Sequence, residues 1–186
     1  RLMQLASWTA DLVVMARHGT RQATVGWVPP DLVESTALDA GRPVLVLPAG
    51  STASRWVQPR RVLLAWKPTR ESARAASAAL PWLPAAAPIE HVAQPAREPM
   101  EPARPGSPEV TAWLRSQGCA GHIEVRDPNG ADDTRLVESL LDWADGWDSD
   151  WLVMGCYGHS RARERLLGGV TRTVLQQMDR PVLMEH

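Results

Sequence analysis

The chain has 186 residues, of which 44% are hydrophobic, and its formal net charge is −1. A chain of this length and composition can bury a substantial core, which argues against disorder throughout. Basic and acidic residues are scattered, which leaves no basic surface for nucleic acid or an anionic membrane, so we expect a small-molecule or protein partner.

The sequence carries no signal for a membrane or for secretion. No apolar run reaches the roughly 20 residues that a bilayer-spanning helix needs, and the first residues lack the apolar region of a signal peptide. Two cysteines, Cys119 and Cys156, are too few for the disulfide framework of a secreted domain. We therefore expect two free thiols and a cytoplasmic protein.

Two short segments near the start of the chain recur near its end. Residues 11–16, DLVVMA, resemble residues 150–155, DWLVMG, and RPVLVL at 42–47 resembles RPVLM at 180–184. The two pairs have offsets of 139 and 138 residues. Because order and spacing both recur, they indicate an internal repeat of ordinary domain size.

The repeat divides the chain into three expected parts. Residues 1–50 are the C-terminal part of a first repeat that lacks its front, 51–60 are a linker, and 61–186 are a nearly complete second repeat. Two such repeats would pack as a pseudo-dimer. Their last strands, Val44 to Leu47 and Val182 to Met184, are the natural pairing edges, because covering an edge removes an aggregation hazard.

Within the second repeat, short segments of strand type alternate with segments of helical periodicity. Five strands are predicted, at residues 61–66, which form a short apolar run, and at 89–93, 122–126, 150–154 and 181–184. Four helices are predicted between these strands. The first has Thr69 as its N-cap and ends at about Leu80, and the second runs from residue 107 to Gly118. The third begins at Asp132, and the fourth spans Val170 to Met178. This alternation predicts an α/β fold, a doubly wound five-stranded parallel sheet with helices on both faces.

Ligands of such sheets bind beyond the carboxyl ends of the strands, where the strand order reverses. The loops after Trp66 and Met154 are therefore the candidates. The second reads GCYG at 155–158, then nine residues, then GGVT at 168–171 before a helix. Glycines and free N–H groups at a helix start suit a phosphate. The same glycines could instead form only a turn and let the helix pack closely on the sheet.

This loop carries a family resemblance. The pattern GxxG, nine residues and GG, with a following helix that ends in RPVLM, resembles the C-terminal signature of the universal stress protein family. VLLAW at 62–66 with its alanine-rich helix is similar to that family's opening segment. The resemblance covers about residues 61–186, with the tail of a second copy at 10–49. It implies an adenine nucleotide alpha hydrolase-like, or Rossmann-like, fold, a homodimer formed through the last strand, and a role in stress survival.

The resemblance also implies that the second repeat binds ATP, accompanied by Mg2+. Met154 and Val92 would line the adenine pocket, Gly169 and Val170 would donate backbone N–H groups, and the other loop glycines would approach the phosphates and ribose. The full set of implied nucleotide-binding residues is Ala65, Trp66, Lys67, Val92, Met154, Gly155, Gly158, His159, Gly168, Gly169, Val170 and Thr171.

Two positions depart from the family pattern. Binding members place an aspartate at the end of the first strand, where this chain has Lys67 and Pro68, and a serine or threonine after the third glycine, where it has Gly169. The Lys67 ammonium could pair with phosphate or be solvated at the rim, but the acid's contact is lost either way. The alternative is a regulatory or protein-interaction module with a degenerate site.

No nucleophile, base or metal constellation emerges from the sequence, so we expect a non-enzymatic protein with at most weak ATP hydrolysis. Cys119 and His122 have a CxxH spacing, but no second pair completes a zinc site. Cys156 could be a redox-sensitive thiol or a small residue that fills a tight turn. In the first repeat Ala16 replaces Gly155, so we expect that repeat to be a structural partner without a site.

Overall fold

The computed structural model describes residues 2–17, 29, 31–50, 58–83, 89–93, 107–119, 123–126, 133–157 and 169–186. Three predicted loop residues, Gly158, His159 and Gly168, lie outside these ranges. His122 does too, and of Val92 only the backbone is described.

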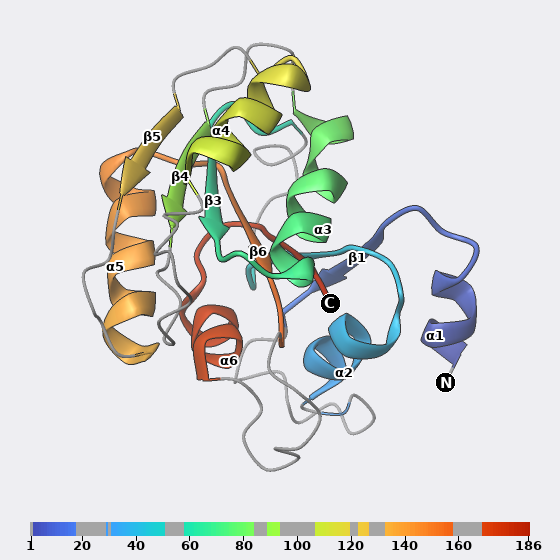
Figure 1. Cartoon of the computed structure of the whole chain (residues 1–186). Helices are drawn as coiled ribbons and strands as arrows, with labels where there is room; N and C mark the ends of the chain where they lie inside the picture. Colours follow the sequence, from blue (N-terminus) through green and yellow to red (C-terminus); the bar gives the residue numbers. More distant parts are fainter. Residues whose placement is uncertain are drawn as a thin grey trace.

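Seven strands form one sheet in the order β1-β2-β7-β6-β3-β4-β5 (Figure 1). The strands are β1 Val13–Ala16, β2 Val44–Leu47, β3 Val62–Trp66, β4 Ile89–Ala93, β5 Ile123–Arg126, β6 Trp151–Gly155 and β7 Val182–Glu185. Neighbours from β5 to β7 are all parallel. This confirms the doubly wound five-stranded parallel sheet predicted for the second repeat, with strand ends within one residue of expectation.

Six α-helices and one short 3-10 helix connect the strands of the described chain. They are α1 Leu2–Ser7, α2 Leu32–Asp39, α3 Arg70–Ala79, η2 Leu80–Trp82, α4 Ser107–Ser116, α5 Asp133–Gly146 and α6 Gly169–Gln177. Thr69 caps α3 as predicted, since its side chain accepts a hydrogen bond from the Ser72 amide at 3.4 Å. No helix in these ranges is both long and apolar enough to cross a membrane.

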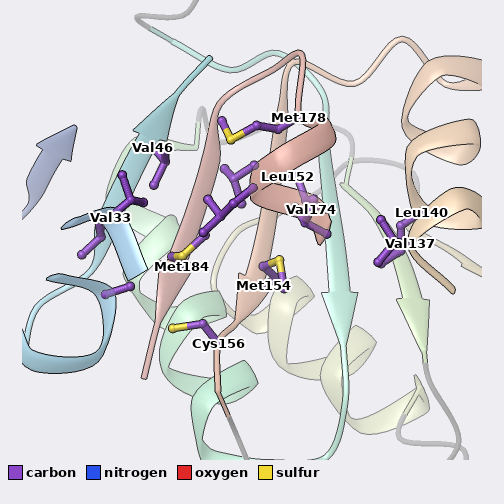
Figure 2. Packing of buried hydrophobic residues seen from close by; sticks show 14 of the residues in the cluster. Val33, Val46, Val137, Leu140, Leu152, Met154, Cys156, Val174, Met178 and Met184 are labelled. Atoms are coloured by element: carbon purple, nitrogen blue, oxygen red, sulfur yellow. The ribbon is translucent and has the colours of Figure 1, made fainter. Parts of the chain in front are cut away.

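Two apolar cores lie on the two faces of the sheet, because side chains alternate along each strand. Leu152 and Met154 of β6 enter the core beneath α2, α5 and α6, part of which Figure 2 shows. Trp151 and Val153 of the same strand enter the core beneath α3 and α4. The helices therefore cover both faces, as a doubly wound sheet requires.

The N-terminal and C-terminal parts of the chain join edge to edge through β2 and β7. These strands pair antiparallel, with Leu45 opposite Leu183 and Val46 opposite Val182. All four side chains are buried. The pairing of these two edges, predicted from the repeat, is confirmed.

The two parts of the chain also share local structure. The order α1-β1-α2-β2 matches α5-β6-α6-β7, and β1 bonds to β2 as β6 bonds to β7. The matching amide-to-carbonyl bonds are Val13 to Pro43 and Leu152 to Pro181, both 3.0 Å, and Arg17 to Leu47 and Cys156 to Glu185, both 2.9 Å. This correspondence supports the proposal of an internal repeat.

The paired strands β2 and β7 form a seam between the two parts of the chain. Truncating a side chain in this seam should lower the free energy of unfolding as much as truncating a core side chain does. Leu183 packs in the core beneath α3 and α4, so Leu183→Ala is expected to lower the free energy of unfolding by about 3 kcal/mol. Val14→Ala, on the exposed face of β1, should change it by no more than about 0.5 kcal/mol. Urea denaturation measures both. If both variants lost the same free energy of unfolding, the seam would not belong to the core.

Candidate functional site

The carboxyl ends of β3 and β6 lie side by side at the point where the strand order reverses. Ala65 is opposite Met154 in the parallel pair. From β3 the chain continues to β4 on one side of this point, and from β6 it continues to β7 on the other. The structure thus brings together the two strand ends that the sequence selected, with Lys67 after one and Gly155 at the end of the other.

Gly155 lies in close contact with the start of α3. A Cβ atom at this position would be 2.6 Å from the backbone nitrogen of Ser72 and 2.7 Å from the carbonyl carbon of Glu71. No ordinary side chain fits at such distances. Gly155 therefore allows the first turn of α3 to rest on the end of β6, a role that the sequence did not predict.

The connection from β3 to α3 is tied to the same turn. The Lys67 amide donates to Ser72 Oγ at 3.3 Å, and the Thr69 amide donates to the Lys67 carbonyl at 2.6 Å. Lys67 itself is half-buried. The residue that replaces the expected aspartate is thus held two residues before the N-cap of α3, where a cation and the N-terminus of a helix both favour an anion.

The other predicted residues are placed as follows. Met154 is buried in the core and points toward Val174 of α6 (Figure 2). Trp66 is half-buried, and its Nε1 is buried without a partner in the described chain. Helix α6 begins at Gly169, followed by half-buried Val170 and buried Thr171. These residues supply the first amide groups of α6.

Two buried carboxylates beside Gly155 were not predicted. Glu71, in the first turn of α3, pairs with Arg70 at 2.6 Å, and Glu185, opposite Gly155 on β7, pairs with Arg74 at 3.2 Å. The second carboxylate oxygen of Glu185 is buried and has no partner among the described residues. The two carboxylates bring negative charge next to Gly155, and their partners Arg70 and Arg74 offset it.

The two acids respond differently to this environment. Burial raises the pKa of Glu71, but hydrogen bonds, first among them the one from Arg70, outweigh it, so the pKa is lowered. Burial also raises the pKa of Glu185, and here the attraction of Arg74 does not outweigh it. Glu185 is therefore the acid whose ionisation the folded state disfavours.

The cysteines are buried free thiols. Burial, together with the charges of Glu185 and Glu71, raises the pKa of Cys156 to about 12. Burial also raises the pKa of Cys119. Because the thiolate is the reactive form, this supports Cys156 as a small packing residue over Cys156 as a redox sensor. Among the described residues no group of histidine, cysteine and acidic side chains could hold a metal ion.

The chain leaves β6 by a strained turn. Tyr157 has a φ of +55°, in the left-handed region that a bulky residue rarely adopts. Its hydroxyl is buried without a partner in the described chain. Burial raises the pKa of this hydroxyl, and the charge of Glu34 raises it further. Backbone strain of this kind clusters at functional turns, and no residue pattern in the sequence predicted it here.

The model of the universal stress protein family matches residues 59–186, more than half of the chain. This chain belongs to the universal stress protein family. The family assignment agrees with the strand order and with the glycine at the end of β6. A comparison with curated proteins yields no match.

Solved universal stress proteins share the fold. One from Archaeoglobus fulgidus DSM 4304 is 15% identical and superimposes with a TM-score of 0.65 over 96% of this chain and 62% of its own. A putative one from Pseudomonas aeruginosa UCBPP-PA14 is 16% identical, with a TM-score of 0.55 over 98% of this chain and 66% of its own. This chain thus spans less than two thirds of the archaeal protein.

A third match is a universal stress protein in complex with cAMP. It is 28% identical and covers 69% of this chain and 98% of its own, with a TM-score of 0.47. Superposition at that level carries no argument about a ligand of this chain.

Adding one methyl group at Gly155 should destabilise the protein. In Gly155→Ala the new Cβ would collide with the α3 backbone, so we expect a loss of about 2 kcal/mol in unfolding free energy. Gly146→Ala is the control, because nothing lies within 4 Å of its Cβ position. It should be neutral or slightly stabilising. If both variants melt like the wild type, α3 does not depend on Gly155.

Replacing Glu185 should change how stability depends on pH. With a folded pKa above the ordinary 4.5, its contribution is full below the unfolded-state pKa and is lost as pH rises through the folded value. Glu185→Gln removes this titration. The variant should therefore gain stability relative to the wild type between pH 4 and pH 7, measured by urea unfolding across that range. If the free energy of unfolding of the variant instead falls relative to that of the wild type as pH rises, the sign of the pKa shift is contradicted.

Proposed function

We propose that this universal stress protein is a non-enzymatic stress-response protein that binds an adenine nucleotide, ATP with Mg2+, in the second repeat. The observation that carries the proposal is the switch point between β3 and β6. Each strand leads into a helix that begins at the carboxyl edge of the sheet, α3 at Arg70 and α6 at Gly169. The helices lie on opposite faces, so their first amide groups lie on both sides of the switch point.

The residues at the switch point have separate tasks in this proposal. The amides of Gly169 and Val170 bind phosphate oxygens, with the Thr171 hydroxyl behind them, and Lys67 supplies a cation in place of the family's aspartate. Ala65 and Trp66 border the ribose.

The adenine pocket and the loop complete the proposed site. Val92 lines the pocket and Met154, a core residue, forms its floor. Gly158, His159 and Gly168 complete the loop, while Gly155 acts indirectly, by seating α3.

The proposed chain consists of part of one repeat, a linker and a second repeat. Residues 1–50 form the end of a first repeat that acts as a structural partner, 51–60 a linker, and 61–186 the binding repeat. The β2–β7 seam is then the intramolecular form of a family-type dimer contact, and a homodimer would need another surface. We place the protein in the cytoplasm.

One observation favours a second candidate function. The space over Gly155 is filled by α3, and two buried carboxylates, Glu71 and Glu185, lie beside it. Both features disfavour close approach of a phosphate at that glycine. If they dominate, the glycine loop is a scaffold element and the protein is a regulatory or protein-interaction module.

Calorimetric titration with Mg-ATP separates the two candidates. We expect saturable binding at a single site that Gly158→Glu abolishes, because the added carboxylate repels phosphate. Gly146→Glu is the matched control. It adds the same charge at the exposed end of α5, which leads to the amino end of β6 and so lies away from the carboxyl ends of β3 and β6. It should bind as the wild type does.

Two results would reject nucleotide binding at this site. One is the absence of heat from all three proteins at millimolar Mg-ATP. The other is binding that both glutamate variants weaken equally, since that would reflect net charge and not the loop. Either result leaves the interaction module as the function.

A further inference from the structure

Helix α6, whose first amides bind phosphate in the proposed function, has little intrinsic stability. It has nine residues, with the sequence GVTRTVLQQ. Five of the nine are glycine, valine or threonine, which are poor helix formers. An isolated helix of this length is marginal in water. The stability of α6 must therefore come from contacts with the rest of the chain.

One source of stability is the apolar core on the inner side of α6. Val174 and Leu175 are buried in a core that also contains Met15 of β1 and Val33 of α2, and Figure 2 shows Val33 and Val174 within it. The N-terminal part of the chain thus contributes to the packing of α6. Packing of this kind holds one side of a helix but leaves the polar groups at its two ends without partners.

The ends of α6 lack the charged residues that commonly stabilise helix ends. The helix has no acidic residue in its first turn and no basic residue in its last turn. Acidic side chains at the start of a helix and basic side chains at its end interact favourably with the helix dipole. Helix α3, by comparison, has Glu71 in its first turn. The first and last turns of α6 therefore do not offset its dipole.

The cation that the last turn lacks comes from the end of β1. The Arg17 guanidinium donates a hydrogen bond from Nη1 to the carbonyl of Gln176, although the two residues are 159 positions apart in the chain. The Arg17 amide donates to the Leu47 carbonyl at 2.9 Å, which ties the backbone of Arg17 to the end of β2. Arg17 is thus held where its charge faces the negative end of the α6 dipole.

We propose that Arg17 is a positioning residue for the nucleotide site. Its cation stabilises the last turn of α6, and because a short helix forms cooperatively, this support extends to the amides of Gly169 and Val170. Those amides bind phosphate in the proposed function, on which this inference rests. The N-terminal part of the chain thus supports a site although it holds none of the proposed ligand-binding residues.

Amide hydrogen exchange in the free protein tests the support of α6 without any nucleotide. Arg17→Ala should speed the exchange of the amides of residues 173–177, which bond within the helix, about two- to fivefold, the effect of one cation at a helix end. The amides of α3, on the other face of the sheet, are the internal control and should keep their exchange rates.

Two further variants separate a specific contact from a general loss of charge. Arg17→Lys keeps a cation with a donor and should restore most of the protection. Arg61→Ala is the matched control, because Arg61 Nη1 donates to the Trp147 carbonyl at 3.1 Å, directly after the end of α5. It removes the same kind of bond at another helix and should leave exchange in α6 unchanged.

The effect on the site is measured by calorimetric titration with Mg-ATP. Arg17→Ala should raise the dissociation constant about two- to fivefold, because the nucleotide then has to order a helix that has lost its support. Arg17→Lys and Arg61→Ala should bind nearly as the wild type does.

The outcomes distinguish this inference from the proposed function. If the wild type does not bind Mg-ATP, the proposed function fails and Arg17 positions no nucleotide site. If the wild type binds and Arg17→Ala binds equally well, this inference alone is overturned and the contact of Arg17 with α6 is structural. Equal acceleration of exchange in α6 by Arg17→Ala and Arg61→Ala would also overturn it.

Discussion

The contact on which the candidate site depends is the one between Gly155 and the first turn of α3. Without a side chain at 155, the backbone of Glu71 and Ser72 lies directly on the end of β6. This contact fixes the N-terminus of α3 at the switch point, where Thr69 caps it and the Lys67 amide bonds to Ser72. It also brings Glu71 to the end of β6, beside Cys156, whose pKa is raised by burial and by the charges of Glu185 and Glu71. The same packing therefore positions the candidate anion site and limits what can enter it.

The Arg-Pro motif before each last strand has a structural reason. Arg180 is buried and donates to the Ser149 carbonyl at 3.0 Å, in the turn between α5 and β6, and also pairs with Asp145 and Asp179. Its counterpart Arg42 donates to the Trp8 carbonyl at 3.1 Å, in the turn after α1. Each arginine ties the start of a last strand to the turn that precedes the neighbouring strand, β6 for Arg180 and β1 for Arg42. The two last strands then present matching edges, which meet in the β2–β7 seam.

Much of the fold can be predicted from the sequence because its signals are local. Strand β4, Ile89–Ala93, is a short segment between Pro88 and Pro95, and α3 follows a threonine cap, so neighbouring residues define each. The seam follows from the repeated Arg-Pro segments. By contrast, α1 has six residues and no acidic residue in its first turn, too short a segment for periodicity to identify. Its stability comes from packing against the rest of the chain.

The candidate site can be predicted only in part, because its properties arise from contacts between distant residues. The glycine pattern locates the loop and the start of α6 at Gly169. It does not reveal that Gly155 contacts Ser72. Nor does it reveal that Glu71 and Glu185 become buried, with Glu71 paired to Arg70 and Glu185 to Arg74. A glutamate in a first helical turn is ordinarily a solvated partner of the helix dipole. Only the packing of α3 on β6 and β7 turns these acids into part of the site.

Binding of an adenine nucleotide between β3 and β6 can be tested by NMR of the backbone amides during a titration with Mg-ATP. Bound nucleotide should produce saturable shifts concentrated at Lys67 to Ser72 and at Gly169 to Thr171, with the β2–β7 seam unchanged. Shifts that cluster elsewhere, or amides at the switch point that stay unperturbed at saturating ligand, would contradict it.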